Sequence, residues 1–210
     1  MFYRRYIKRA LDLICATLAL IVLSPVLLVT AILVRIKLGS PVIFVQERPG
    51  YKEKIFRMYK FRTMTNEKGE SGKLLPDEKR LTSFGKFLRK TSLDELPELI
   101  NIVKGDMSII GPRALLVSYL PYYTPEQHRR HDVVPGLVGL AALHGRNNQS
   151  WDDKFKYDIE YVDNISFGLD LKILFGAVGV VLKREGVNLE GHATTENFIE
   201  SVKKKEIVMK

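Results

Sequence analysis

The sequence predicts an α+β fold that is mostly helical, with an N-terminal membrane helix followed by a small helix-rich domain carrying short strands. Two observations predict it. Residues Leu13–Val34 form an almost uncharged apolar run, and the rest of the chain shows helical apolar spacing with only short β-rich stretches. The part from residue 39 onward is long enough for one compact domain and too short for two. We therefore expect a membrane segment at residues 1–38 and one domain at residues 39–210.

The apolar run contains a helix-breaking pair at its midpoint, Ser24-Pro25. As a straight helix the run would be ~33 Å long, enough to cross a hydrocarbon core of ~30 Å. Pro25 lacks an amide hydrogen and its ring presses on the Ile21 carbonyl, which costs ~3 kcal/mol in a straight helix. A break there leaves two arms of about 11 residues and ~16 Å each. The Ser24 hydroxyl can then bond the freed carbonyl of Leu20.

Two topologies fit this segment, a re-entrant hairpin and a single-pass helix with a tolerated proline. Both flanks are basic, so the positive-inside rule gives no direction for crossing. These flanking residues are Arg4, Arg5, Lys8 and Arg9 on one side, and Arg35 and Lys37 on the other. The residues alone leave both topologies open, whereas a cleaved signal peptide fits poorly because the run is too long and has no small-residue cleavage site.

Charge and cysteine content limit the classes of partner. The 33 Lys and Arg residues exceed the 24 Asp and Glu residues, and the net charge of +9 favours anionic surfaces. With a membrane segment present and no nucleic-acid-binding motif, we expect membrane lipid and phosphorylated ligands rather than nucleic acid. Cys15 is the only cysteine, which excludes an intrachain disulfide and a cysteine zinc site and agrees with a cytoplasmic domain.

The domain begins with a predicted hairpin and two helices. Residues 41–46 and 54–64 are β-rich and flank a Pro49-Gly50 turn. Apolar spacing predicts a short helix around residues 84–90, and Thr91-Ser92 interrupts it. Pro97 fits only a first helical turn, so a second helix is expected to begin near Asp94 and end at Gly105. Its apolar face has the spacing i, i+3, i+4 and i+7: Leu96, Leu99, Ile100 and Val103.

Further along, residues 107–110 predict a short strand that leads through Gly111-Pro112 to Arg113. Pro135-Gly136 is expected to open a glycine-containing loop. Ser150 can cap a helix that starts at Trp151. Residues 169–182 are too short to span a bilayer and predict a core or interfacial helix.

The adjacent carboxylates Asp94 and Glu95 have two interpretations. Acidic residues are favoured at helix starts whether or not they catalyse anything, so spacing alone favours capping. Arg89 and Lys90 lie one turn earlier, and Arg113 follows after the predicted strand. A carboxylate held among such cations with a divalent metal can attack a phosphoryl group. The histidines have no convincing metal spacing, and neither a Walker loop nor a GxGxxG motif is present.

Residues 91–113, TSLDELPELINIVKGDMSIIGPR, strongly resemble the signature of the bacterial sugar transferase family, the monotopic phosphoglycosyl transferases. The resemblance extends over nearly the whole chain. It includes Ser24-Pro25, VIFVQERPG, IFRMYKFRTM, RHDVVPGLVGL, HGRN, and LDLKILF with GHATTENF. Several separate motifs in one order make the match specific.

The resemblance implies a re-entrant membrane helix that leaves the catalytic domain on the cytoplasmic face of a bacterial inner membrane. It implies transfer of a sugar 1-phosphate from a UDP-sugar to polyprenyl (undecaprenyl) phosphate, which gives polyprenyl diphosphate-sugar and UMP. The implied sugar is an N-acetylated amino sugar such as diacetylbacillosamine, added in the first membrane step of glycoconjugate synthesis and protein glycosylation. The alternative from another class is an inactive membrane-tethered scaffold that recruits later glycosyltransferases.

The resemblance also implies roles for individual residues. Asp94 would be the nucleophile that forms an aspartyl phosphosugar, Glu95 its partner in the dyad, and both would bind Mg²⁺. The implied phosphate or nucleotide contacts are Lys60, Arg89, Arg113, Arg146 and Asp158. The sequence departs from the family pattern at Ala114, where a second proline is common, and at residues 140–144, where Gln and Asn are usual.

Overall fold

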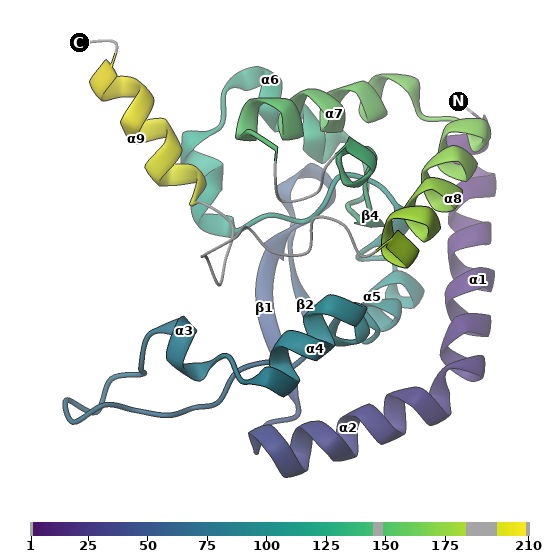
Figure 1. Ribbon diagram of the computed structural model, residues 1–210. Coiled ribbons are helices and arrows are strands. Elements are labelled where there is room, and N and C mark those ends of the chain that lie inside the picture. The colour runs from purple at the N-terminus through teal and green to yellow at the C-terminus, as the bar shows by residue number, and fades with distance from the viewer. Residues whose placement is uncertain (1, 145–148, 184–196, 209–210) are drawn as a thin grey trace.

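The computed structural model describes residues 2–144, 149–183 and 197–208. Two small two-stranded sheets lie among helices, so the expected mostly helical fold with short strands is confirmed (Figure 1). After a π-helical turn at Tyr3–Ile7, the helices are α1 (Lys8–Val22), α2 (Ser24–Leu38), α3 (Asp77–Arg80), α4 (Ser83–Thr91), α5 (Glu98–Lys104), α6 (Pro125–His128), α7 (Trp151–Asn164), α8 (Phe167–Lys183) and α9 (Phe198–Val208). The strands are β1 (Ile43–Pro49), β2 (Ile55–Phe61), β3 (Ser108–Ile110) and β4 (Gly136–Val138).

The apolar run is bent by 63° between α1 and α2, which confirms the predicted break. Pro25 lies in the first turn of α2, where its missing N–H is not needed. The Ser24 hydroxyl donates to the carbonyl of Ile21 at 2.8 Å, so the expected bond to Leu20 is wrong because Leu23 (φ −88°, ψ 2°) leaves the helical conformation. No single described helix has the length and hydropathy of a membrane span, and α1 and α2 meet that measure only as a bent pair.

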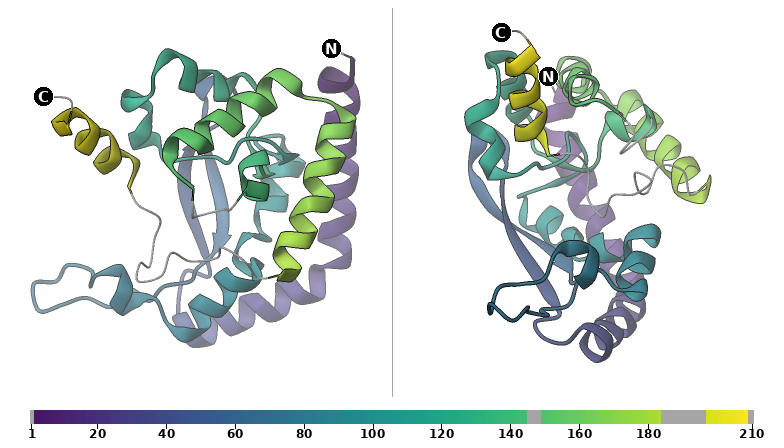
Figure 2. Two further views of the ribbon diagram at one scale, coloured as in Figure 1. Left: turned by 45° about the horizontal axis from the view of Figure 1, so that its top comes forward. Right: turned by 60° about the vertical axis from the view of Figure 1, so that its left-hand side comes forward.

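Each arm of the bent pair has 15 residues, or ~22 Å, which is longer than expected because the helices continue into the basic flanks. Figure 2 shows α1 along one side of the molecule and α2 turning beneath it. The outward faces expose apolar side chains: Leu13, Ile14, Leu18, Ile21, Val22, Leu28, Val29, Ile32 and Ile36. Such a continuous apolar surface is suited to lipid rather than water.

The inner face of α1 carries polar side chains in its first half, and these bond to the domain. Its bonds join Lys8 Nζ to Asp170 (2.6 Å), Asp12 to the amide of Ile109 (2.9 Å), and Arg9 to the carbonyls of Ile102 and Val103 (2.6 and 2.8 Å). The two carbonyls lie in the last turn of α5, where the helix dipole stabilises a positive charge. Helix α1 is therefore packed into the domain and is more than an anchor.

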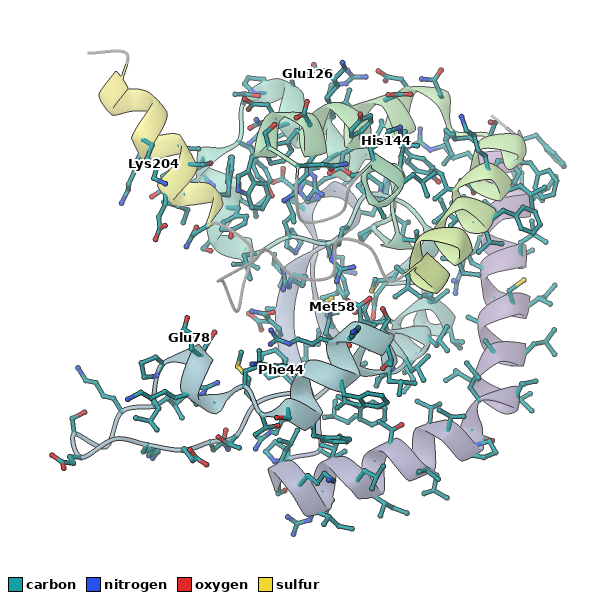
Figure 3. All side chains as sticks on the ribbon, viewed as in Figure 1. Phe44, Met58, Glu78, Glu126, His144 and Lys204 are labelled. Atoms are coloured by element: carbon teal, nitrogen blue, oxygen red, sulfur yellow. The ribbon has the colours of Figure 1, made fainter. Side chains whose placement is uncertain are left out.

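The predicted hairpin is confirmed. Strands β1 and β2 pair antiparallel with Ile43 opposite Phe61 and Pro49 opposite Ile55. Phe56 and Met58 are buried against α1 and α5, in one cluster with Ala16, Leu99 and Ile102, and Met58 is labelled in Figure 3. Side chains two apart on a strand share a face, so Lys60 points inward at the end of this apolar stripe.

Asn101 joins α5 to the unpaired edge of β2. It is fully buried, its Oδ1 accepts from the amide of Tyr59 at 3.0 Å, and its Nδ2 donates to the carbonyl of Arg57 at 2.7 Å. Two backbone groups of an edge strand are satisfied by one side chain, which fixes the helix against the hairpin.

Helix α5 differs from its prediction in its start and in its buried face. It begins at Glu98, and the two carboxylates lie before it in a 3₁₀ turn, Leu93–Glu95. Gly105 ends it as expected, with φ 92°. The expected inward position of Ile100 is wrong, since this side chain is 44% exposed. The helix is rotated because Glu98 and Asn101 have polar partners on β2.

The loop expected at Pro135-Gly136 is also wrong, because Gly136–Val138 forms strand β4 parallel to the predicted strand β3. The backbones approach so closely that a Cβ on Gly136 would lie 2.1 Å from the Gly111 nitrogen. Pairing between segments far apart in sequence overrides the local turn signal. The Ser150 cap of α7 is confirmed, since its hydroxyl accepts from the amide of Asp153 at 3.1 Å.

The buried His131 predicts loss of stability in acid. Burial, with repulsion from Arg130, lowers the pKa of His131 to about 4, although its bond to the Gly50 carbonyl opposes the shift. In the unfolded chain the pKa is about 6.5. As the pH falls from 6.5 towards 4, only the unfolded chain gains this proton, so the free energy of unfolding decreases.

We expect His131→Gln to remove this part of the pH dependence. The measurement is the melting temperature of both proteins in lipid nanodiscs at pH 7.5 and 5. An equal drop in the two proteins would contradict the assignment.

Candidate active site

Asp94 is buried and its carboxylate is unengaged. It follows Ser92, whose left-handed conformation (φ 56°) turns the chain out of α4. The side chain is 8% exposed, and within the described part of the chain it has no hydrogen bond or ion pair. Burial and repulsion from Glu95 raise the pKa of Asp94, while nearby Lys60, Arg113 and Arg89 oppose the shift. A buried carboxylate without a hydrogen-bond donor keeps its lone pairs available for attack.

Glu95 is held between two cations. Its Oε1 accepts from Lys60 Nζ at 2.9 Å and also from the guanidinium of Arg113. Burial alone would raise the pKa of Glu95, but attraction from Arg113 and Lys60 outweighs it and lowers the pKa. Glu95 is therefore ionised at neutral pH. The two carboxylates of the dyad have different environments and are fitted for different roles.

A third carboxylate, Glu98, belongs to the site and was not predicted. It is 2% exposed and forms an ion pair with Lys60 Nζ at 3.0 Å. Burial raises the pKa of Glu98, and Lys60 opposes this. Lys60 thus bridges Glu95 and Glu98. The overlooked signal is the i, i+3 spacing of Glu98 and Asn101, which places two polar residues on one face of the helix, outside its predicted apolar face.

Arg89 reaches the site from the last turn of α4. Its Nε donates to the hydroxyl of Thr63 at 3.1 Å. Burial lowers the pKa of Arg89, and the attraction of Asp94 acts in the opposite direction. Helix α4 lies directly on the backbone of Thr63, because a Cβ on Gly85 would be only 1.8 Å from that carbonyl oxygen. This close approach holds Arg89 within electrostatic reach of Asp94.

The structure brings together five of the residues proposed for the site. They are Lys60, Arg89, Asp94, Glu95 and Arg113. Asp158 is the exception: it is 5% exposed and ion-paired with Arg130 at 2.6 Å, so a direct phosphate contact no longer fits it. Arg146 lies outside the described residues. At residues 140–144, which depart from the family pattern, the His144 ring stacks on Tyr157, with ring centroids 4.1 Å apart.

Asp94 and Glu95 are the residues that could hold a Mg²⁺ ion if substrate completed its shell. Among the residues that the structure describes, no three His, Cys, Asp or Glu side chains form a metal cluster. Mg²⁺ usually takes one or two carboxylates and completes its shell with waters and substrate phosphates. Asp94 is free to contribute an oxygen, and Glu95 engages both its cations through Oε1 alone.

The chain belongs to the bacterial sugar transferase family, whose family model matches residues 3–184. It is 53% identical over 192 residues to EpsL of Bacillus subtilis, named as an uncharacterized sugar transferase, and the match covers 91% of this chain and 95% of that protein. It is 36% identical over 199 residues to the undecaprenyl-phosphate galactose phosphotransferase of Salmonella typhimurium, covering 87% of this chain and 42% of that protein.

A third relative, from Aeromonas hydrophila, is named UDP-N-acetylgalactosamine-undecaprenyl-phosphate N-acetylgalactosaminephosphotransferase. The identity is 36% over 185 residues, which are 84% of this chain and 44% of that protein. The chain therefore spans nearly all of the Bacillus relative and less than half of the other two. The names of the latter two agree on the lipid phosphate and differ in the sugar.

The Lys60 bridge predicts a large stability loss on its removal. In Lys60→Met, the buried Glu98 loses its cation, and breaking such a pair typically costs ~3–5 kcal/mol. Combining this change with Glu98→Gln should recover most of the loss. Lys104→Met is the matched control, because the Lys104–Asp106 pair is exposed and worth under about 1 kcal/mol. Chemical unfolding in nanodiscs measures all four proteins, and equal losses in Lys60→Met and Lys104→Met would contradict the bridge.

Proposed function

We propose that this protein transfers a sugar 1-phosphate from a UDP-sugar to undecaprenyl phosphate, giving undecaprenyl diphosphate-sugar and UMP. The observation that carries the proposal is the buried, unengaged carboxylate of Asp94 beside a dyad partner held by Lys60 and Arg113. Membership in the sugar transferase family and the lipid phosphate in the relatives' names support it. For the sugar we propose an N-acetylated amino sugar, in line with the motif resemblance and the Aeromonas relative.

In the first step, an Asp94 oxygen attacks the β-phosphorus of the UDP-sugar. The bond from this phosphorus to the bridging oxygen breaks, UMP leaves with the electron pair, and an aspartyl phosphosugar remains. In the second step, a phosphate oxygen of undecaprenyl phosphate attacks the same phosphorus and releases the Asp94 carboxylate. Each step exchanges one P–O bond for another, so no oxidant or reductant is required.

The surrounding residues hold charge during both steps. Arg113 is 54% exposed at its side chain and keeps guanidinium nitrogens beyond the Glu95 bond for a substrate phosphate. Arg89 is close enough to attract Asp94, and Lys60 lies between two carboxylates, so we expect both positive charges to act on the diphosphate. Mg²⁺ held by Asp94 and Glu95 would neutralise charge on the leaving UMP.

We also propose that α1 and α2 form a re-entrant hairpin, with the domain on the cytoplasmic face of the inner membrane. Their bend and their outward apolar faces support this. A lipid-linked phosphate is confined to the headgroup layer, whereas a UDP-sugar is soluble. An enzyme seated at the cytoplasmic surface reaches both substrates.

The reaction is tested by UMP release in nanodiscs with undecaprenyl phosphate and Mg²⁺. The donor panel contains the UDP derivatives of diacetylbacillosamine, N-acetylglucosamine, N-acetylgalactosamine, galactose and glucose. We expect release with at least one acetylated donor and with none when Mg²⁺ is chelated. No UMP release with any donor would overturn the enzyme proposal in favour of a membrane-tethered scaffold. A preference for the galactose or glucose donor would overturn the sugar assignment.

The nucleophile is tested by mass spectrometry of enzyme quenched with its active donor before lipid phosphate is added. We expect a sugar-phosphate adduct on the peptide that contains Asp94. Asp94→Asn should lose the adduct and reduce turnover at least ~10³-fold while it retains its melting temperature. Asp77→Asn, an exposed position on α3, is the control and should behave as the unchanged protein. An adduct on another side chain would overturn the assignment.

The topology is tested by labelling Phe2→Cys and Glu126→Cys in a Cys15→Ser background with a membrane-impermeant maleimide. Both positions are exposed, the first before α1 and the second in the domain. A re-entrant hairpin places both on the cytoplasmic side, so labelling should require permeabilised cells for each. Labelling of position 2 alone in intact spheroplasts would show a membrane-spanning helix instead.

A further inference from the structure

Two successive carbonyls in the segment that bears Arg113 each accept a bond from a guanidinium. Arg130 donates to the carbonyl oxygen of Arg113 at 2.7 Å, and Arg48 donates to that of Ala114 at 3.2 Å. Arg130 comes from the turn after α6, and Arg48 from β1. Charged donors from two separate elements therefore meet at the main chain of one catalytic segment.

The guanidinium of Arg130 is also held by a buried carboxylate, Asp158. Its Nε and a terminal nitrogen both donate to Asp158 Oδ2, at 3.0 and 2.6 Å, and the two residues are 3% and 5% exposed. Its guanidinium carbon also lies 6.0 Å from the ring centre of Tyr123 and 5.7 Å from that of Phe155. Buried ion pairs often add little net stability, because desolvation offsets their attraction. The buried Arg130–Asp158 pair is therefore better explained by the fixed geometry that it gives Arg130 than by added stability.

Arg48 has no carboxylate partner in the part of the chain that the structure describes. Besides the Ala114 carbonyl, it donates to the Gln46 side chain at 2.6 Å, and its Nε is buried without a hydrogen bond. Burial, together with repulsion from Arg113, lowers the pKa of Arg48 to about 10. Its terminal nitrogens both have protein partners and its Nε is inaccessible, so the side chain is built to hold the main chain rather than a ligand.

We propose that Arg130, held by Asp158, and Arg48 are positioning residues that fix the main chain at residues 113–114. The fixed main chain directs the Arg113 side chain to Glu95 and to the substrate diphosphate. Asp158 then acts through Arg130 and not by touching substrate. The role rests on the proposed function, because Arg113 must contact a phosphorylated ligand. A displacement of ~1 Å in such a group can cost about 100-fold in rate.

The test is a double-mutant cycle on Arg130→Lys and Arg113→Lys, read as kcat/KM for UMP release. Arg130→Lys keeps the positive charge but loses the guanidinium group that bonds both Asp158 and the Arg113 carbonyl. We expect it to lower kcat/KM about 10- to 100-fold in the unchanged protein and less than about threefold in the Arg113→Lys background. Asp158→Asn and Arg48→Lys should show the same dependence on Arg113. Arg129→Lys, an exposed neighbour paired with Glu126, is the matched control and should leave kcat/KM unchanged.

The melting temperature of each variant separates positioning from unfolding, and Asp158→Asn replaces Arg130→Lys in the cycle if the latter fails to fold. Equal fold-losses in kcat/KM from Arg130→Lys or Asp158→Asn in both backgrounds would overturn the proposal, since a general structural role does not depend on Arg113.

If the unchanged protein releases no UMP with any donor, the proposed function fails. The same cycle is then read as the dissociation constant of UDP by calorimetry, where additive losses, or no loss at all, overturn the positioning role.

Discussion

The attachment of α1 to the domain is the constraint on which the other parts of the structure depend. Arg9 bonds the last carbonyls of α5, Asp12 bonds the amide of Ile109 at β3, and Lys8 pairs with Asp170 on α8. These three residues join the apolar helix to α8, to β3 and to α5, the helix that begins directly after the turn bearing the dyad. The position of α1 and the position of the dyad within the molecule are therefore coupled.

Three carboxylates lie in one short segment, Asp94 and Glu98 buried and Glu95 half-buried, and they require cations from other elements. Lys60 comes from β2, Arg89 from α4 and Arg113 from the loop after β3. Their distribution is uneven, since Glu95 and Glu98 share Lys60 while Asp94 keeps its oxygens unengaged. This asymmetry distinguishes Asp94, the proposed nucleophile, from Glu95, an anion held by two cations, although both side chains have the same chemistry in isolation.

Local signals in the sequence were sufficient for features that depend on neighbouring residues. The bend at Ser24-Pro25, the hairpin and the Ser150 cap follow from proline geometry, alternation and side-chain hydrogen bonding. The rotation of α5 and the strand at Gly136 depend on partners far away in the chain, which no local pattern contains. Motif resemblance brought Asp158 into the site as a phosphate contact, whereas its ion pair with Arg130 is a contact that the sequence pattern does not contain.

The polar inner face of α1 has a practical consequence for making a water-soluble form of the enzyme. Removing residues 1–38 would leave two carbonyls of α5 without their donor and Asp170 without its cation. It would also expose the core that packs around Ala16. Such a fragment would lose packing and hydrogen bonds next to the turn that bears Asp94 and Glu95. Redesign should instead keep both helices and replace only their outward leucines, isoleucines and valines with charged side chains.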